Sequence, residues 1–598
     1  MSAIFINPTS ADQKHIDACF IRFPEATKTT IWEQYCLIYS GLGAKQANRF
    51  LASVDAEKWK KSSFVTSKDR LANETKQAMD NAAEDQSAYA IGVKIFKREG
   101  LEPPQGKTPK SRMARMIDPD VWERKLLKRR KQLDEKAIRD KGRIYREGEP
   151  YSSNWNVSAF IQAQQDTQAF LKRQRVVSNE GDELSLADIA QSTVANPANR
   201  RHEMMTRMRG TEEIAKEMGM TCLFITFTAA SIFHTKALVG GEFITDKQGE
   251  RQRIGGTFIN NPNYQKTLEI KNSKGEIEKV ANTPKQSHEF IKRIVGRSIA
   301  QFKRDEINYL GYKVVEPNHD GTVHWHMAFF VSPNQQSQAT EIFTHYALQE
   351  YGDEKGAKQH RIVIKEHDPK LGSVTGYMAK YISKGISGQD MGEDYETGLD
   401  AEDSTVRLLA WKSIWSIRQF AFYGSPSVGV WRELRRLREP LANPTAEQAR
   451  LAADAGHWDI FAKLMKKNPI VIKHVTIFDK QGKVKTNKYG EGVERIYGLK
   501  VFGLSGIEVL RTRLKEWFLI DLDKLEQRLI RGLPFQCRED ESYLNQIKAV
   551  IQKAMDTNKV SRLYQRTGGI LPFAESTFAA ISASPPLGLV GNKVTQRE

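Results

Sequence analysis

The sequence predicts an α+β fold in which mainly helical N- and C-terminal regions flank a central antiparallel sheet of ferredoxin-like type. An Asn-His-Asp-Gly turn at residues 318–321 separates two apolar, β-branched runs, and Asp-Gly is a strong hairpin signal. Segments with strand character alternate with segments of helix character around this hairpin. This order favours a two-layer sheet with the hairpin at its centre over a doubly wound parallel sheet.

The chain of 598 residues is too long for one hydrophobic core, and its length predicts about three domains. We expect a helical N-terminal region over residues 1–180, which would bind DNA or a host factor, and the sheet domain with a flanking basic helix over residues 190–440. Residues 441–581 are expected to form an α/β accessory region. The Pro- and Gly-containing segment 582–598 is expected to be disordered.

The N-terminal region has the composition of helices over residues 30–39, 44–52, 69–90 and 120–138. A Pro-Pro-Gln-Gly break at 103–106 precedes a tract rich in Lys and Arg. A solvated helix face and a contact with the DNA backbone explain this tract about equally well, because acidic residues partly neutralise its far end. The candidate DNA-binding residues of the tract are Lys128, Arg129 and Arg130.

The sheet domain begins after residue 219, and its strands and helices follow one another along the chain. The expected elements before the acidic loop at 388–402 are a strand at 221–228, a polar excursion at 240–285, a helix at 288–304, the hairpin, a helix at 338–351, a strand at 361–366 and a helix at 375–384. A helix and strand at 404–422 and a basic helix at 430–438 follow the loop. The candidate DNA-binding residues of this part are Arg418, Arg432, Arg435 and Arg436.

The C-terminal accessory region combines helix and hairpin patterns. The expected elements are a helix at 447–467, a hairpin around 479–482, and helices at 519–529 and 541–553.

The formal net charge of +18, with both signs abundant, predicts a globular protein with an anionic polymer as its partner. Nucleic acid is the first expectation and an anionic membrane surface the second. The chain has no apolar run of membrane-spanning length and no signal peptide pattern at its N-terminus, so we expect a soluble intracellular protein with no membrane partner. The four cysteines lack C-x-x-C spacing, which argues against a disulfide framework and a cysteine zinc site.

The hairpin carries a candidate metal site. Side chains alternate between the two faces of a strand, so His324 and His326 point the same way and Trp325 points to the opposite face. A tight turn brings Glu316 of the partner strand near the level of the histidines, which completes a set of two imidazoles and one carboxylate. One packed and one exposed histidine is the alternative interpretation. The neighbouring His319 and Asp320 are explained by the turn itself.

A second candidate feature lies about fifty residues further on. Tyr377 and Tyr381 stand four apart in a helical segment, so both phenols occupy one face, although tyrosines at this spacing also occur in core stripes. Lys380 and Lys384 lie on a neighbouring face and would place ammonium groups near a phosphate or a phenolate. A phenol with a pKa of about 10 needs a nearby cation or metal to act as a nucleophile at neutral pH. No P-loop pattern is present, so duplex unwinding would need a separate helicase.

These motifs resemble the HUH endonucleases and, within them, the replication gene A proteins of double-stranded DNA bacteriophages, which initiate rolling-circle replication. The resemblance rests on residues 224–228 as the first motif, 316–326 as the metal motif and 377–384 as the tyrosine motif. Segments 196–219 and 415–437 also resemble this phage family, so the similarity covers about residues 190–440. Two departures are Val323, where the family often has proline, and Ala230-Ser231, where it has Pro-Ser. The tyrosines follow the histidines as in replication initiators, whereas conjugative relaxases have the reverse order.

The resemblance implies a site-specific single-strand endonuclease and ligase with a covalent tyrosine intermediate. Glu316, His324 and His326 would hold Mg²⁺ or Mn²⁺, and one tyrosine would attack the scissile phosphate to leave a 5′-phosphotyrosine and a free 3′-OH primer. The second tyrosine would act in strand transfer, while Lys380 and Lys384 would stabilise charge. The implied partners are single-stranded or supercoiled origin DNA and a host helicase and DNA polymerase, in the cytoplasm of the bacterial host.

Two other classes of protein fit the same residues less completely. One is a noncatalytic DNA-binding protein in which the histidines hold a structural metal. The other is a metal-dependent nuclease that uses water as its nucleophile, and such an enzyme would not need Tyr377 or Tyr381. The sequence leaves open the origin sequence, the order in which the tyrosines act, the metal and the oligomeric state.

Overall fold

The computed structural model confirms the α+β class, with antiparallel sheets and helices packed on them. It describes residues 8–13, 16, 31–32, 34–36, 38–40, 43–82, 84–178, 180, 182–245, 251–271, 275–388, 393–394, 397, 399–479, 481–503, 506–515 and 517–520. The helix expected at 541–553 and the tail expected at 582–598 lie outside the described residues, as does most of the helix expected at 519–529. In the segment expected as a helix at 30–39, the residues that the structure describes are helical. In the described part of the chain, no helix has both the length and the apolar content needed to cross a membrane.

The central sheet has five strands in the order β12-β3-β11-β10-β15, and every neighbouring pair is antiparallel. The predicted hairpin supplies β10 and β11 from the middle of the sheet. The strands are β3 (Thr221–Thr228), β10 (Tyr309–Pro317), β11 (Val323–Val331), β12 (Ile362–Glu366) and β15 (Phe420–Tyr423).

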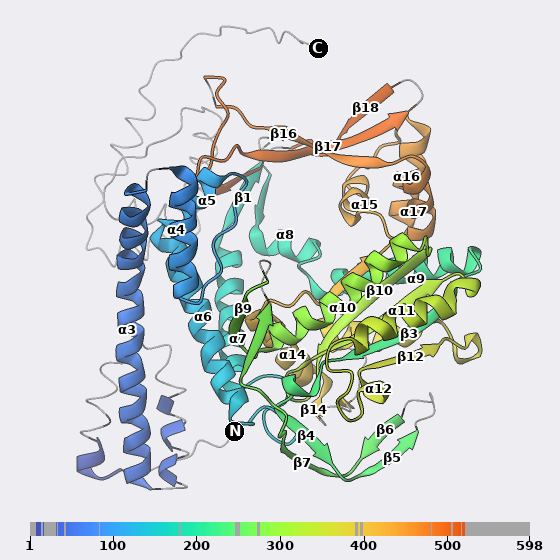
Figure 1. Cartoon of the computed structure of the whole chain (residues 1–598). Coiled ribbons are helices and arrows are strands. Elements are labelled where there is room, and N and C mark those ends of the chain that lie inside the picture. Colours follow the sequence, from blue (N-terminus) through green and yellow to red (C-terminus); the bar gives the residue numbers. More distant parts are fainter. Residues whose placement is uncertain are drawn as a thin grey trace, which may run out of the picture.

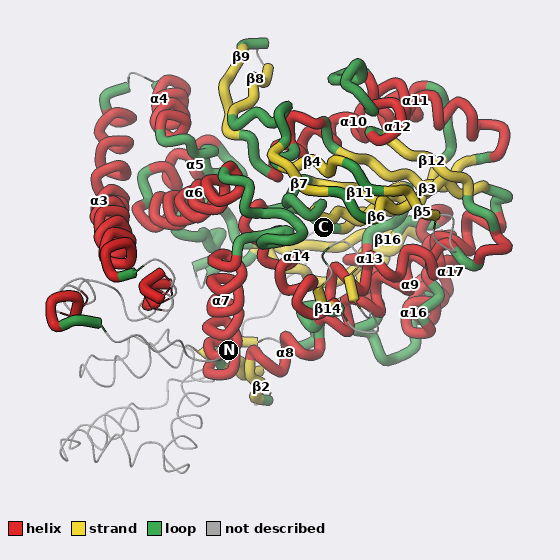
Figure 2. Tube along the Cα trace, turned by 90° about the horizontal axis from the view of Figure 1, so that it is seen from below, coloured by secondary structure: helices red, strands yellow, loops and turns green. Residues whose placement is uncertain are grey.

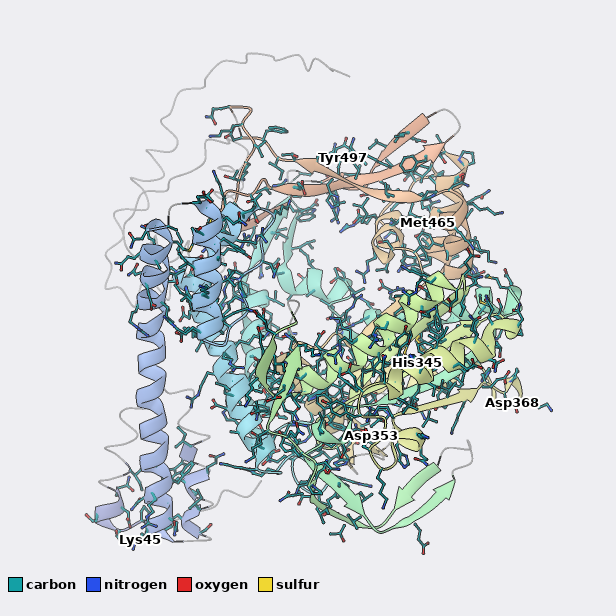
Figure 3. All side chains as sticks on the ribbon, in the orientation of Figure 1. Lys45, His345, Asp353, Asp368, Met465 and Tyr497 are labelled. Carbon is teal, nitrogen blue, oxygen red and sulfur yellow. The ribbon has the colours of Figure 1, made fainter. Side chains whose placement is uncertain are left out.

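Helices cover both faces of this sheet, which therefore lies in the middle of three layers rather than in the expected two (Figure 2). One face packs against α10 (Pro284–Arg304) and α11 (Gln336–Leu348), and the other against α9 (Pro197–Glu217) and α13 (Val374–Ile386). The physical reason is that the inner strands are apolar on both faces, so both must be buried. Figure 3 shows the side chains between these layers and labels His345 on α11.

The turn between β10 and β11 is held by a buried carboxylate. Asp320 accepts hydrogen bonds from the backbone N–H of Thr322 at 3.0 Å and of Thr235 at 2.9 Å, and its carboxylate lies 3.3 Å from Nδ1 of His234. Burial alone would raise the pKa of Asp320, but His234 and further partners lower it well below its ordinary value. Gly321 adopts φ 77°, a conformation that glycine reaches without strain.

The N-terminal region consists of helices along one side of the molecule and a small sheet (Figure 1). The segment expected as one helix at 69–90 is divided, because α3 ends at Asp80 and α4 begins at Asp85. The elements are α3 (Ala44–Asp80), α4 (Asp85–Arg98), α5 (Pro109–Met116), α6 (Pro119–Asp140), α7 (Asn154–Arg173), β1 (Arg175–Ser178), β2 (Glu183–Ser185) and α8 (Leu186–Ser192).

The excursion between β3 and α10 forms three two-stranded sheets, β4 with β7, β5 with β6 and β8 with β9. Their strands are β4 (Lys236–Val239), β5 (Glu242–Thr245), β6 (Arg251–Ile254), β7 (Thr257–Asn260), β8 (Thr267–Lys271) and β9 (Ile277–Ala281). The further elements that follow β11 are α12 (Ala357–His360), β13 (Glu393–Asp394), β14 (Leu399–Asp400) and α14 (Ala401–Trp415).

The C-terminal part packs three helices against a three-stranded sheet. The expected basic helix at 430–438 ends earlier, at Leu434, and the expected helix at 447–467 is broken at Gly456, which adopts φ 79°. Residues 519–520 belong to a strand that pairs with β1, whereas a helix was expected to begin there. The elements are α15 (Val428–Leu434), α16 (Pro444–Ala455), α17 (Trp458–Lys467), β16 (Ile470–Thr476), β17 (Glu494–Gly503), β18 (Gly506–Arg511) and β19 (Trp517–Ile520).

Candidate active site

The hairpin places two histidines and a glutamate on the face of the sheet that α13 covers. Glu316 of β10 pairs directly with His324 of β11, and the two imidazole rings of His324 and His326 have centroids 4.6 Å apart. Trp325 lies in the core on the opposite face, as the alternation of side chains predicts. The register of one hairpin therefore brings two imidazoles and a carboxylate to one position.

Two threonines of β3 contact these histidines from the neighbouring strand. The Oγ1 atoms of Thr226 and Thr228 lie 3.3 Å from Nδ1 of His326 and His324, respectively. A hydrogen bond at Nδ1 fixes the ring and leaves Nε2 for another ligand. Nε2 of His326 is buried and has no hydrogen-bond partner among the residues that the structure describes. These threonines were assigned no role from the sequence. Their spacing of two on a predicted strand, which places both side chains on one face, is the signal that could have identified them.

The electrostatic environment keeps His326 neutral. Burial lowers its pKa well below the ordinary value, and the charges of His324, Lys380 and Lys384 lower it further. A neutral imidazole can donate a lone pair to a metal, so this shift suits a ligand rather than a proton carrier.

Helix α13 holds the two tyrosines over the histidines. The hydroxyl oxygens of Tyr377 and Tyr381 are 3.5 Å apart, so the predicted common face is confirmed. The Tyr381 ring stacks on His326 with centroids 4.0 Å apart and an interplanar angle of 22°. Tyr377 packs against Phe224 of β3, with centroids 4.3 Å apart. Both phenols are therefore held by ring contacts beside the histidine pair.

The N-terminus of α13 is fixed by a carboxylate from α9. Glu212 is buried and accepts hydrogen bonds from the backbone N–H groups of Val374 at 3.2 Å and Thr375 at 2.8 Å. A negative charge at a helix N-terminus satisfies free N–H groups and interacts favourably with the helix dipole. Burial would raise the pKa of Glu212, but hydrogen bonds from Lys216 and Thr375 bring it below the ordinary value. Glu212 is therefore a positioning residue for the tyrosine helix.

The two lysines of α13 have different surroundings. Nζ of Lys380 lies 4.5 Å from the centroid of the Tyr377 ring and 4.8 Å from that of Tyr381, in agreement with an ammonium group near the phenols. Lys384 is buried, and its Nζ lies 3.2 Å from Asp394 and 3.5 Å from Glu316. Lys384 thus contacts the carboxylate of the candidate metal site.

A second carboxylate and a third tyrosine complete the surroundings of Lys384. The hydroxyl of Tyr151, in the N-terminal region, donates a hydrogen bond to Asp394 at 2.8 Å. Asp394 lies in the acidic loop, and neither residue carries a motif in the sequence. Their role becomes visible only when the chain is folded.

The donor set of Glu316, His324 and His326 fits a divalent cation by chemistry, because two imidazoles and a carboxylate are common ligands of such ions. The buried Nε2 of His326 supports this fit. Over the described ranges, however, no three His, Cys, Asp or Glu side chains are already gathered closely enough to hold a metal. The ammonium group of Lys384 is the cation beside Glu316 in this structure.

Three of the candidate DNA-binding residues lie at the end of α15. Arg432 pairs with Glu203 at 2.6 Å, and Arg436 lies 3.5 Å from Glu433. Arg435 is exposed at the end of α15.

The remaining candidates divide between two places. Arg130 pairs with Asp134 at 3.0 Å, and Arg129 extends toward Gly100 at the end of α4. Lys128 instead reaches Ser416 and hydrogen-bonds its hydroxyl, which places this lysine near the exposed Arg418.

The chain is thus an α+β protein whose central antiparallel sheet and tyrosine helix form one polar site. It belongs to the bacteriophage replication gene A protein family, whose sequence model matches residues 43–389. It is 34% identical over 421 residues to a probable replication protein of Pseudoalteromonas phage PM2, which covers 68% of this chain and 58% of that protein. It is 30% identical over 419 residues to the replication gene A protein of Escherichia phage P2, covering 69% and 52% of the two chains.

A third relative carries a name that mentions an activity. The chain is 27% identical over 407 residues to a probable replication endonuclease from a prophage-like region of Salmonella typhi, covering 65% of this chain and 46% of that protein. The chain therefore matches about half of the length of these relatives. No solved structure matches it significantly.

Proposed function

We propose that the chain initiates rolling-circle replication by nicking single-stranded origin DNA through a tyrosine, on a ferredoxin-like HUH sheet. The observation that carries this proposal is the pair of hydroxyls of Tyr377 and Tyr381, 3.5 Å apart, beside His326. Two adjacent nucleophiles next to a set of metal-binding side chains suit successive transfers of one phosphoryl group. The names of the family members support a role in replication.

The proposed reaction is a transesterification. The oxygen of one tyrosine attacks the scissile phosphorus and loses its proton, while the bond from phosphorus to the 3′ oxygen breaks. That oxygen takes up a proton and becomes a free 3′-OH, and the tyrosine keeps the 5′-phosphate as a phosphodiester. The ammonium group of Lys380, near both phenol rings, stabilises the phenolate and the charge on the phosphate.

The candidate metal site would complete this chemistry. Glu316, His324 and His326 would hold Mg²⁺ or Mn²⁺, which would supply positive charge against a nonbridging oxygen of the phosphate. The neutral state of His326, which its lowered pKa favours, is the state that such a ligand needs.

The second tyrosine gives the proposed enzyme its ligase activity. Once the origin is regenerated, the hydroxyl of the second tyrosine attacks the new scissile phosphate. The 3′-OH released by this cleavage attacks the first phosphotyrosine. This step closes a DNA circle and frees the first tyrosine. The first 3′-OH primes a host polymerase, and a host helicase unwinds the duplex in the cytoplasm of the bacterial cell.

Covalent capture tests the proposal against its two alternatives. Wild-type chain and the double variant Tyr377→Phe with Tyr381→Phe are incubated with single-stranded origin DNA and Mn²⁺, denatured and separated by size. We expect a denaturation-resistant adduct from the wild type only. A noncatalytic DNA-binding protein gives neither adduct nor cleavage. A nuclease that uses water still cleaves DNA when both hydroxyls are absent.

A further inference from the structure

A basic cavity lies on the face of the sheet opposite the tyrosines. Its volume is about 500 Å³, within the range of small-molecule sites. Helix α10, strands β10, β11 and β15 and the segment before β15 line it. The basic side chains among its lining residues are Lys285, Lys292, Lys313 and Arg418, His288 adds an imidazole, and Glu289 is the acidic one.

The cations are arranged from an exposed mouth to a buried floor. Lys285, Lys292 and Arg418 are exposed, whereas His288 and Lys313 are 7% exposed. Glu289 pairs with Lys292 at 2.9 Å and so neutralises a cation at the mouth. Within the described ranges, Lys313 has no carboxylate at ion-pairing distance. The floor therefore holds a buried lysine that no carboxylate of the described residues neutralises.

Two buried nitrogen atoms at the floor also lack hydrogen-bond partners among the described residues. Nε1 of Trp325 and Nδ1 of His288 are buried without a hydrogen-bond partner in the part of the chain that the structure describes. The indole N–H can only donate, and an ammonium group has three donors and no acceptor. Nζ of Lys313 lies 3.0 Å from the centroid of the Trp325 ring. The floor thus offers several donors to a ligand that is rich in acceptors.

The charges around the floor favour binding of an anion. Burial, with smaller contributions from Arg418 and Lys292 and an opposing one from Glu289, lowers the pKa of Lys313 to about 7. Burial likewise lowers the pKa of His288 to about 3, with contributions from Lys313, Lys292 and Lys285. A bound anion would remove the repulsion between these groups and restore the charge of Lys313. A buried lysine without a carboxylate partner costs stability, and a bound anion would offset this cost.

The cavity is connected to the tyrosine site through one short segment. Ser416 and Arg418 line the cavity, while Gln419 packs against Gly385 of α13. Lys128 of the N-terminal basic tract reaches the cavity mouth through its hydrogen bond to Ser416. The mouth therefore lies beside the basic helix α6 and the edge strand β15, and residues 416–419 link it to the tyrosine helix α13.

We propose that this cavity binds a phosphate group, with Lys313 and Trp325 at the floor and Arg418 and Lys285 at the mouth. A phosphate suits the cavity because it combines negative charge with several acceptor oxygens. Two ligands carry this group: a backbone phosphate of the DNA strand and the phosphates of a nucleotide. The DNA strand is the expected source, and this choice rests on the proposed function.

Equilibrium binding tests the cavity separately from cleavage. Lys313→Met and Arg418→Gln are introduced one at a time into the full chain. All proteins compared also carry Tyr377→Phe and Tyr381→Phe, which prevent covalent capture. Lys303→Gln removes an exposed charge from the same helix α10 outside the cavity and serves as the control. The ligands are a fluorescent single-stranded oligonucleotide of about 16 nucleotides, a deoxynucleoside triphosphate and inorganic phosphate.

We expect Lys313→Met and Arg418→Gln each to weaken oligonucleotide binding on the order of tenfold, and Lys313→Arg to retain it. The plot of log affinity against log salt concentration should become less steep, by about 0.7 in slope for each lost phosphate contact. Weaker triphosphate binding with unchanged oligonucleotide binding assigns the cavity to a nucleotide. Equal affinities of all variants for all three ligands, with thermal unfolding showing folded protein, overturn the proposal. Adduct formation by the wild type is measured separately, so failure of the cavity and failure of the proposed nicking activity give different results.

Discussion

The Tyr381 ring stacks on the imidazole of His326, with ring centroids 4.0 Å apart and an interplanar angle of 22°. This contact joins a candidate nucleophile to a candidate metal ligand. Because the ring is held by packing, removing only its hydroxyl should leave the histidine in place. Phenylalanine is therefore the informative substitution at position 381, whereas alanine would disturb both groups.

Thr226→Val should weaken binding of Mn²⁺. The threonine hydroxyl lies 3.3 Å from Nδ1 of His326, and valine keeps the shape of the side chain while removing this hydrogen bond. Loss of such an outer contact typically lowers metal affinity by about 10- to 100-fold. Titration of Mn²⁺ followed by electron paramagnetic resonance measures the change. Thr221→Val, on the same strand β3, should bind like the wild type, and equal affinities of both variants would show that Thr226 does not support the site.

Asp394→Asn should also lower the affinity for Mn²⁺. Lys384 lies 3.2 Å from Asp394 and 3.5 Å from Glu316, so loss of the Asp394 charge turns the ammonium group more fully toward Glu316. A cation would then compete with Lys384 for the same carboxylate. Adding Lys384→Met removes this competitor and should restore the affinity, measured by the same titration. A higher affinity of the Asp394→Asn variant would contradict the competition.

Glu212→Gln should destabilise the attachment of the tyrosine helix. The buried carboxylate accepts two backbone N–H groups at the N-terminus of α13, and the loss of such a group costs about 1 to 2 kcal/mol. We expect a lower free energy of unfolding in urea and slower adduct formation. Glu213→Gln, next to it on α9, is the control. Unchanged stability and unchanged adduct formation of the Glu212→Gln variant would show that Glu212 does not position the tyrosine helix.

Lys313→Met should stabilise the chain near pH 7 and not near pH 10. The pKa of Lys313 is lowered to about 7 by burial, while an unfolded lysine has a pKa of about 10.4. Between these values the unfolded state binds more protons, so the stability of the wild type rises with pH in this window. The gain from methionine should be on the order of 1 to 3 kcal/mol at pH 7 and shrink as the pH rises. Urea unfolding of both proteins from pH 6 to 10 measures this difference in the free energy of unfolding. A gain that does not change with pH would contradict a lowered pKa of Lys313 in the folded protein.

Local sequence was enough to predict the geometry of the hairpin and the common face of the tyrosines. A tight turn sets the pairing of Glu316 with His324, and a spacing of four sets the Tyr377 and Tyr381 faces. Helix breaks were harder to predict, because Gly456 in a left-handed conformation divides a segment that otherwise has helical composition.

Contacts between distant parts of the chain could not be predicted from the sequence. Thr226 and His326 are 100 residues apart, and Tyr151 and Asp394 are 243 apart. Such contacts depend on the order of the strands and on the packing of α9 and α13, which local patterns do not determine. The helical layer on the second face and the basic cavity behind Trp325 were missed for the same reason.

The most direct test of the proposed function is the fate of the two DNA ends. A single-stranded origin oligonucleotide is labelled at its 5′ end in one sample and at its 3′ end in another, and each sample is incubated with wild-type chain and Mn²⁺. Formation of a 5′-phosphotyrosine predicts that only the 3′-terminal label becomes attached to the protein, and that peptide mass spectrometry finds the nucleotide on Tyr377 or Tyr381. Release of both labelled halves as free DNA, with equal cleavage by the double Phe variant, would contradict the central claim.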